Sequence, residues 1–185
     1  MDMVGERLIA ASRETVWEAL NDTETLKSCI PGCETIERQS PTEMSAVAKI
    51  KIGPMSAKFG GKVLLSEMDP PNGYRISGEG QGGAAGFAKG GADVRLEERD
   101  GGTLLSYVVK AQVGGKMAQI GARLIDATAK SLADQFFTRF AAAVGAPPPV
   151  DGTEAAADSD EAKQGVMGRV KGLFGGRKGA KEDAD

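Results

Sequence analysis

Histidine is missing from this sequence: none of its 185 residues is a histidine. Histidine is the commonest general base, the usual partner of a nucleophilic serine or cysteine, and the commonest ligand of transition metals. The chain also offers no inward-facing pair of carboxylates and no cluster of metal-binding residue types. These absences weaken every enzymatic hypothesis, and we predict that the chain has no catalytic residues and no metal site.

The sequence also has no apolar run long enough to form a membrane-spanning helix or a secretory signal. It begins MDMVGERLIAASRE, with acidic residues from the outset. Its formal net charge of -3 is too small, and of the wrong sign, to indicate nucleic-acid binding over the whole molecule. We therefore predict a cytoplasmic protein that does not bind nucleic acid.

Two features that could carry chemistry have simpler interpretations. Cys29 and Cys33 bracket Ile-Pro-Gly, a spacing that fits neither a thioredoxin-type pair nor half of a zinc site, so a structural role is favoured over a redox role. The glycine-rich stretch GEGQGGAAGFAKGG lies among strands and away from any helix start, where a phosphate would bind. We interpret it as strand ends and a flexible rim.

The order of predicted elements indicates an α+β fold. A strand over residues 3–10 leads to Ser12, an N-cap residue for a short helix, and a second short helix begins at Asp22. From residue 34 to 113 the apolar residues recur with period two, and turn signals divide this region into six strands. Residues 116–144 contain no proline and carry apolar residues at helical spacing. We predict a helix-grip (START/SRPBCC-like) fold, with a seven-stranded antiparallel curved sheet wrapped around a long C-terminal helix and two short helices after the first strand.

Small residues are unusually frequent on the predicted inner face of the sheet. Glycine and alanine are poor strand formers, so their number there needs a reason. Either the long helix approaches the sheet closely, or space is kept free for a ligand, and both can hold in different zones. We predict an apolar ligand cavity near the start of the long helix, lined by Trp17, Leu20, Leu26, Ile30, Pro31, Met55, Phe59, Gly61, Ile76, Gly78, Ala92, Val94, Tyr107, Met117, Ile120, Gly121 and Leu124.

Composition divides the chain into three parts. Residues 1–145 form the predicted ligand-binding domain, and residues 146–161 are an acidic linker rich in proline and alanine that can bury almost nothing. Residues 162–185 are basic and, if helical, place an apolar arc between cations, which is typical of a helix at a membrane interface. The predicted membrane-binding residues are Val166, Met167, Arg169, Val170, Lys171, Leu173, Phe174, Arg177 and Lys178. The five glycines between residues 165 and 176 predict weak, reversible binding. A solvated tail and a helix that docks on a protein partner are the alternatives.

Four segments together resemble one known family. They are the N-terminal strand, ETVWEALNDTETLKSCIPGCE, GPMSAKFGGKV and GGKMAQIGARLIDATAKSLADQFFTRF. They are similar to the CoxG family of carbon monoxide dehydrogenase subunits, within the START-like SRPBCC superfamily. The resemblance covers about residues 1–145, and CIPGCE is its most specific element.

The resemblance implies an accessory protein that associates the molybdenum-containing carbon monoxide dehydrogenase with the inner face of the cell membrane. Electrons from carbon monoxide oxidation must reach the respiratory quinone pool, so we hypothesise that the cavity binds a respiratory quinone, menaquinone or ubiquinone. A static membrane anchor without a ligand and a general lipid carrier are competing hypotheses, and a related molybdenum hydroxylase could be the partner. An enzyme of the aromatase or cyclase kind would need acid or base groups in the pocket, for which Tyr74, Tyr107 and Lys116 are the only weak candidates.

Overall fold

The computed structural model describes residues 1–145. The predicted linker, 146–161, and the predicted membrane-binding tail, 162–185, lie outside the described residues. Within residues 1–145 no helix is long and apolar enough to cross a membrane.

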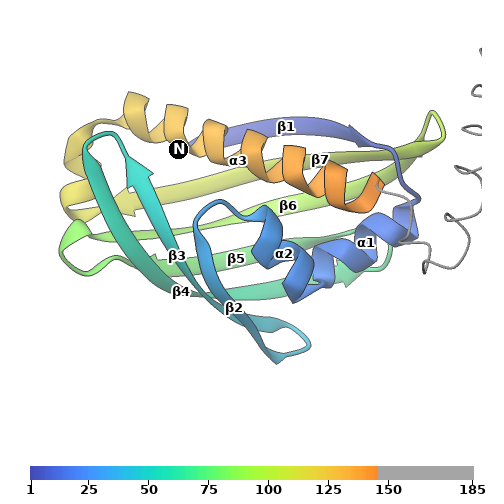
Figure 1. The fold of residues 1–185 in the computed structure, drawn as a ribbon, viewed down its shortest axis with the longest axis horizontal. Coiled ribbons are helices and arrows are strands. Elements are labelled where there is room, and N and C mark those ends of the chain that lie inside the picture. The colour runs from blue at the N-terminus through green and yellow to red at the C-terminus, as the bar shows by residue number, and fades with distance from the viewer. Residues whose placement is uncertain (146–185) are drawn as a thin grey trace, which may run out of the picture. The chain divides into compact units, whose positions relative to one another are not determined.

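One antiparallel sheet of seven strands forms the body of the domain (Figure 1). Its strand order is β1-β7-β6-β5-β4-β3-β2, so six consecutive strands form a meander and the first strand pairs with the last. Apolar residues alternate along the strands, so each strand can turn one face toward the core of the domain. This arrangement confirms the predicted fold class. The strands are β1 (Asp2–Ile9), β2 (Cys33–Ser40), β3 (Glu43–Ile52), β4 (Met55–Asp69), β5 (Gly73–Gln81), β6 (Phe87–Arg99) and β7 (Gly102–Gly114).

Two short helices, α1 (Arg13–Asn21) and α2 (Thr23–Cys29), follow β1. The side chain of Ser12 accepts a hydrogen bond from the backbone of Thr15 and caps α1, as its position predicts. Asp22 ends α1 and caps α2 by accepting hydrogen bonds from the hydroxyl and backbone of Thr25 at 2.6 and 2.8 Å. These bonds stabilise the carboxylate and lower the pKa of Asp22 below its ordinary value.

The long helix α3 (Ala122–Gly145) begins later than the sequence pattern predicts. The prediction that the helix includes Lys116 is wrong, because residues Gly115–Ile120 form a 3-10 turn, η2. Gly121 follows it with φ of +106°, a backbone conformation that L side chains rarely adopt and that interrupts the helix. Figure 1 shows α3 lying across the sheet, with α1 and α2 beside its C-terminal half.

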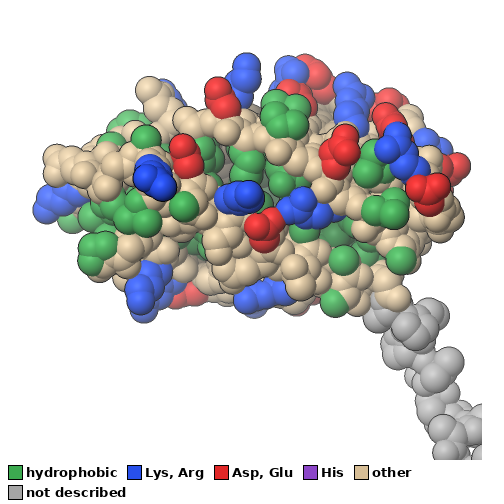
Figure 2. Space-filling view, turned by 90° about the horizontal axis from the view of Figure 1, so that it is seen from above, with side chains coloured by type: hydrophobic (Ala, Val, Ile, Leu, Met, Phe, Trp, Pro, Cys, Tyr) green, Lys and Arg blue, Asp and Glu red, His purple; other side chains and the backbone are tan. Residues whose placement is uncertain are grey.

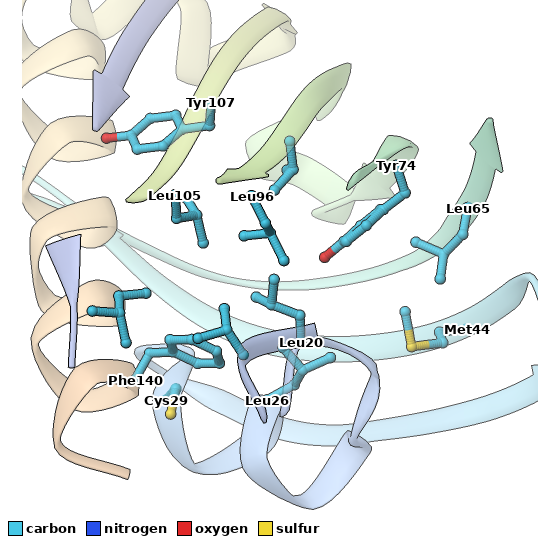
Figure 3. Close-up of a cluster of buried hydrophobic side chains, with 13 residues drawn as sticks. Leu20, Leu26, Cys29, Met44, Leu65, Tyr74, Leu96, Leu105, Tyr107 and Phe140 are labelled. Carbon is cyan, nitrogen blue, oxygen red and sulfur yellow. The ribbon is translucent and has the colours of Figure 1, made fainter. Parts of the chain in front are cut away.

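The packed core lies where α1, α2 and the C-terminal half of α3 meet the sheet. Phe140 of α3 and Val16 of α1 are fully buried, and Ile9, Cys29 and Leu105 are almost so. Figure 3 shows Cys29 and Phe140 reaching this cluster from the helices and Leu105 reaching it from the sheet. The two cysteines are free thiols, one in this core and one at the start of β2.

Glycines on the inner face allow neighbouring strands to approach closely. A Cβ on Gly61 of β4 would lie 2.2 Å from the carbonyl oxygen of Glu79 on β5, and a Cβ on Gly90 of β6 would lie 2.3 Å from that of Lys110 on β7. The nearest atoms therefore belong to the adjacent strand and not to α3. The close approach of neighbouring strands therefore explains why glycine occupies these two positions. Neither close packing of α3 nor space for a ligand is required to explain them.

Candidate ligand-binding site

A partly open apolar cavity of about 420 Å³ lies between the sheet, α2 and α3. This volume is within the range of small-molecule sites, roughly 300 to 1,000 Å³. The sheet supplies the floor, and α2, its following loop and the middle of α3 supply the cover. The lining residues are Met3, Leu20, Leu26, Ile30, Pro31, Ile36, Met44, Val63, Leu65, Tyr74, Ile76, Ala92, Val94, Leu105, Tyr107, Val109, Leu132, Ala133, Phe136 and Phe137.

The structure brings together one part of the predicted site. The predicted residues that line the cavity are Leu20, Leu26, Ile30, Pro31, Ile76, Ala92, Val94 and Tyr107. They come from the first two helices, the loop after α2 and the middle of strands β5 to β7. Whether they contact a ligand stays a prediction.

Nine predicted residues do not line this cavity: Trp17, Met55, Phe59, Gly61, Gly78, Met117, Ile120, Gly121 and Leu124. Trp17 makes an edge-to-face contact with Tyr74, which does line the cavity. The others lie in β4 and β5 or in the connection from β7 to α3 and its first turn. Leu124, in the first turn of α3, lies instead beside Gly53 in the turn between β3 and β4, where a Cβ would be 2.8 Å from the Leu124 side chain. The expectation that the cavity lies near the start of the helix is corrected: its helical wall is the middle of α3.

Several lining residues lie outside the predicted set although the sequence carries a signal for them. Val63, Leu65 and Tyr74 fall on the inner face by alternation alone. Phe136 and Phe137 lie near the end of the long helix, where the pattern predicts core, and the structure places both on the cavity wall. The other lining residues outside the predicted set are Met3, Ile36, Met44, Leu105, Val109, Leu132 and Ala133.

Aromatic contacts fix the wall beside the edge strand β1. The rings of Tyr107 and Phe137 are stacked with centroids 5.1 Å apart. A Cβ on Gly5 would lie 2.3 Å from the Tyr107 hydroxyl oxygen, so the tyrosine ring extends over β1 because position 5 has no side chain. Arg7 lies 5.5 Å from the centroid of Phe137 and pairs with Asp134 of α3. These contacts hold α3 against β1 at this side of the cavity.

Tyr74 lies at the same level of the sheet as Tyr107, but two strands away from it. Tyr74 pairs with Val94, and Val94 pairs with Tyr107, so the two tyrosines are two strands apart at one level. The ring of Tyr74 meets that of Trp17 edge to face, with centroids 5.3 Å apart. Only 6% of Tyr74 is exposed, and this burial raises the pKa of its phenol well above the ordinary value. Tyr74 therefore remains a neutral hydrogen-bond donor at neutral pH.

We expect the folded domain to keep Tyr74 protonated at a pH where the unfolded chain ionises it. The chain has two tyrosines, so a Tyr107→Phe variant leaves Tyr74 as the only one. Tyrosinate absorbance should rise at clearly higher pH in the folded variant than in the same variant unfolded in urea. Because the folded pKa is the raised one, this contribution to stability is complete below about pH 10 and is lost as the pH rises further. Equal midpoints in the two states would contradict the buried position of Tyr74.

Other surfaces of the described domain are less suited to an apolar ligand. The outer face of the sheet has a more open hollow of about 800 Å³, lined by charged residues that include Lys62, Glu79, Lys89 and Lys110. Figure 2 shows one face of the molecule from above, where basic and acidic side chains are spread out with hydrophobic side chains between them. Within residues 1–145, no three His, Cys, Asp or Glu side chains gather into a group that could hold a metal ion.

Comparison with solved structures shows the same fold in proteins of several bacteria. A conserved protein from Geobacillus kaustophilus is 30% identical with a TM-score of 0.73, over 78% of this chain and 95% of that chain. A protein from Chromobacterium violaceum is 16% identical with a TM-score of 0.60, over 79% of this chain and 98% of that chain. The Zhui aromatase/cyclase from Streptomyces is 13% identical with a TM-score of 0.57, over 78% of this chain and 93% of that chain.

No curated protein matches the sequence. The sequence model of one family of carbon monoxide dehydrogenase subunits, CoxG, matches residues 5–145. That match begins inside β1 and includes the other six strands and the helices α1, α2 and α3, so it contains all or part of every element that lines the cavity. The chain therefore belongs to the CoxG family of carbon monoxide dehydrogenase subunits.

Proposed function

We propose that this protein is a carrier that holds a respiratory quinone in its apolar cavity and links carbon monoxide dehydrogenase to the quinone pool of the membrane. The protein itself performs no chemistry in this proposal. The dehydrogenase would reduce the quinone, and the carrier would take up and return it at the cytoplasmic face of the membrane.

The observation that carries this proposal is the apolar cavity of about 420 Å³ between the sheet, α2 and α3. A polyprenyl quinone is nearly insoluble in water, so its transfer to a soluble enzyme requires an apolar container. Among residues 1–145, all the lining side chains except two tyrosines are apolar. Burying a ligand against them gains roughly 25 cal/mol for each Å² of apolar surface removed from water. Because the cavity is partly open, a chain longer than the cavity could extend through the opening.

Family membership supports the accessory part of the proposal. The CoxG family indicates a non-catalytic role beside carbon monoxide dehydrogenase. The similarity to the Zhui aromatase/cyclase, at 13% identity, concerns the fold alone. In the described domain the cavity wall carries no carboxylate, amine or thiol that could act as an acid, base or nucleophile.

The test is to identify what the full-length protein carries. The protein would be purified without detergent from its native host, extracted with organic solvent and analysed by mass spectrometry, with a mock purification from a deletion strain as control. We expect about one quinone per chain. A phospholipid in its place would favour a general lipid carrier. If no lipophilic molecule were found and added quinone failed to bind, the static membrane adaptor would become the better explanation.

We expect the full-length protein to bind vesicles that contain anionic phospholipid and to be released by salt. Each basic residue of the tail near an anionic surface contributes about 1 kcal/mol, and ions screen this attraction. Replacing both Leu173 and Phe174 by aspartate should abolish co-sedimentation, because it removes apolar contacts and adds repelled charges.

In a matched control, Ala155 and Ala156 of the linker are replaced by aspartate, which adds the same two negative charges outside the tail. This variant should still sediment with the vesicles. Equal loss of binding in both variants would mean that net charge alone governs the interaction, and binding unaffected by the changes at Leu173 and Phe174 would exclude the tail as the membrane contact.

A further inference from the structure

The cavity wall contains two polar side chains, and one of them points into the buried cluster. Within residues 1–145, Tyr74 and Tyr107 are the only lining residues with a side-chain oxygen or nitrogen. The Tyr107 hydroxyl lies over Gly5 at the edge of the sheet. The Tyr74 hydroxyl instead points away from β5 toward the middle of the cluster (Figure 3). Among the described residues, no side chain or backbone group forms a hydrogen bond with it.

The Tyr74 hydroxyl has no protein partner, but protein atoms do not enclose it completely. Within residues 1–145, Nε of Arg13 is the one fully buried side-chain nitrogen or oxygen without a hydrogen bond, so the Tyr74 hydroxyl keeps some accessible surface, at the wall of the partly open cavity. Phenylalanine would make the same edge-to-face contact with Trp17, so that contact does not require the hydroxyl. The surrounding packing holds the ring in one orientation, because Tyr74 pairs with Val94 in the sheet and its ring makes an edge-to-face contact with Trp17. A donor that is fixed, neutral and directed into an apolar cavity is suited to a ligand that brings its own acceptor.

We propose that the hydroxyl of Tyr74 donates a hydrogen bond to a carbonyl oxygen of the bound quinone and so places its head group at the β5 side of the cavity. This inference rests on the proposed function. It also gives the site its selectivity, because a hydrocarbon of the same shape would leave the hydroxyl unpaired, whereas a quinone would satisfy it.

The experiment compares two ligands and three proteins. The ligands are a naphthoquinone with a short isoprenoid chain and a naphthalene with the same chain but no carbonyl groups. The full-length protein and its Tyr74→Phe and Tyr107→Phe variants are titrated with each ligand. Fluorescence of Trp17, the only tryptophan of the chain, is the binding signal. We expect Tyr74→Phe to weaken quinone binding about 3- to 10-fold, the range of a single net hydrogen bond, and to leave hydrocarbon binding unchanged or slightly stronger.

The carbonyl stretching band of the bound quinone gives a second readout. Infrared spectra should place this band at lower frequency in the unsubstituted protein than in Tyr74→Phe, because a hydrogen bond weakens the carbonyl bond. Thermal unfolding of the variant confirms that it is folded.

Three results would overturn the inference in different ways. Equal weakening for both ligands would make Tyr74 a packing residue. A selective loss of quinone affinity in Tyr107→Phe, with none in Tyr74→Phe, would assign the donor to the other tyrosine. If the unsubstituted protein bound the hydrocarbon but not the quinone, or neither ligand, the proposed function would fail together with the inference that rests on it.

Discussion

Replacing Ala133 by tryptophan should reduce quinone affinity at least about 100-fold while the domain stays folded. Ala133 lies in the middle of α3, where its methyl group forms part of the cavity wall. An indole ring at this position would occupy much of the 420 Å³ that the ligand needs. A 100-fold loss corresponds to about 2.8 kcal/mol, which is a modest share of the apolar contacts that a quinone would make.

The effect on the free energy of unfolding should be small. Adding a large side chain to a filled core usually costs about 1 to 3 kcal/mol, because neighbouring side chains are forced out of their preferred rotamers. Here the indole enters space that is already empty, so the added apolar contacts offset that cost. Equilibrium titration with a short-chain quinone and thermal unfolding without ligand measure the two effects separately.

The matched control is Ala127→Trp, the same substitution on the exposed face of the same helix. This variant has the same change in composition and in helix propensity, but the indole lies in solvent. It should bind quinone like the unsubstituted protein. If both variants bound quinone normally, the cavity between the sheet, α2 and α3 would not be the ligand site.

The sequence predicts the sheet well because each strand carries its own signal. Alternation assigns the inner face of β4 and β5 correctly, and turn residues such as Asn72 mark where the strands end. The order of elements then leaves few arrangements that bury every apolar face, so the helix-grip fold follows. The start of α3 is different, because Gly121 fits an apolar helical pattern as well as it fits a break. Its φ of +106° is set by the path that the chain takes from β7 and not by neighbouring residues.

The place of the cavity could not be predicted for a related reason. An inner-face position lines a cavity only if no side chain from a helix fills the space above it, and that depends on where α3 crosses the sheet. Phe59 and Val63 share one face of β4, but only Val63 lies under the middle of α3 and lines the cavity. Glycine is also a misleading signal, because Gly61 serves the close approach of β4 to β5.

Replacing Phe140 by alanine should lower the free energy of unfolding by about 3 to 5 kcal/mol. Phe140 is fully buried and is the side chain through which the C-terminal half of α3 enters the core, beside Cys29 of α2 (Figure 3). Its ring also stacks on Phe136, with centroids 5.6 Å apart. Since domains of this size are stable by roughly 5 to 15 kcal/mol, the loss is a large fraction of the total, and denaturant unfolding monitored by circular dichroism will measure it.

Phe136→Ala is the informative comparison, because Phe136 lies one turn earlier on the same helix but borders the cavity. Part of its ring already faces empty space, so its removal deletes fewer contacts and should cost clearly less than the change at Phe140. A short-chain quinone should raise the stability of the unsubstituted protein more than that of the Phe136→Ala variant, because the Phe136 ring is part of the cavity wall that would contact the ligand. Equal costs for the two substitutions in ligand-free protein would mean that the space beside Phe136 is filled in solution, and the hollow core on which the carrier proposal depends would be contradicted.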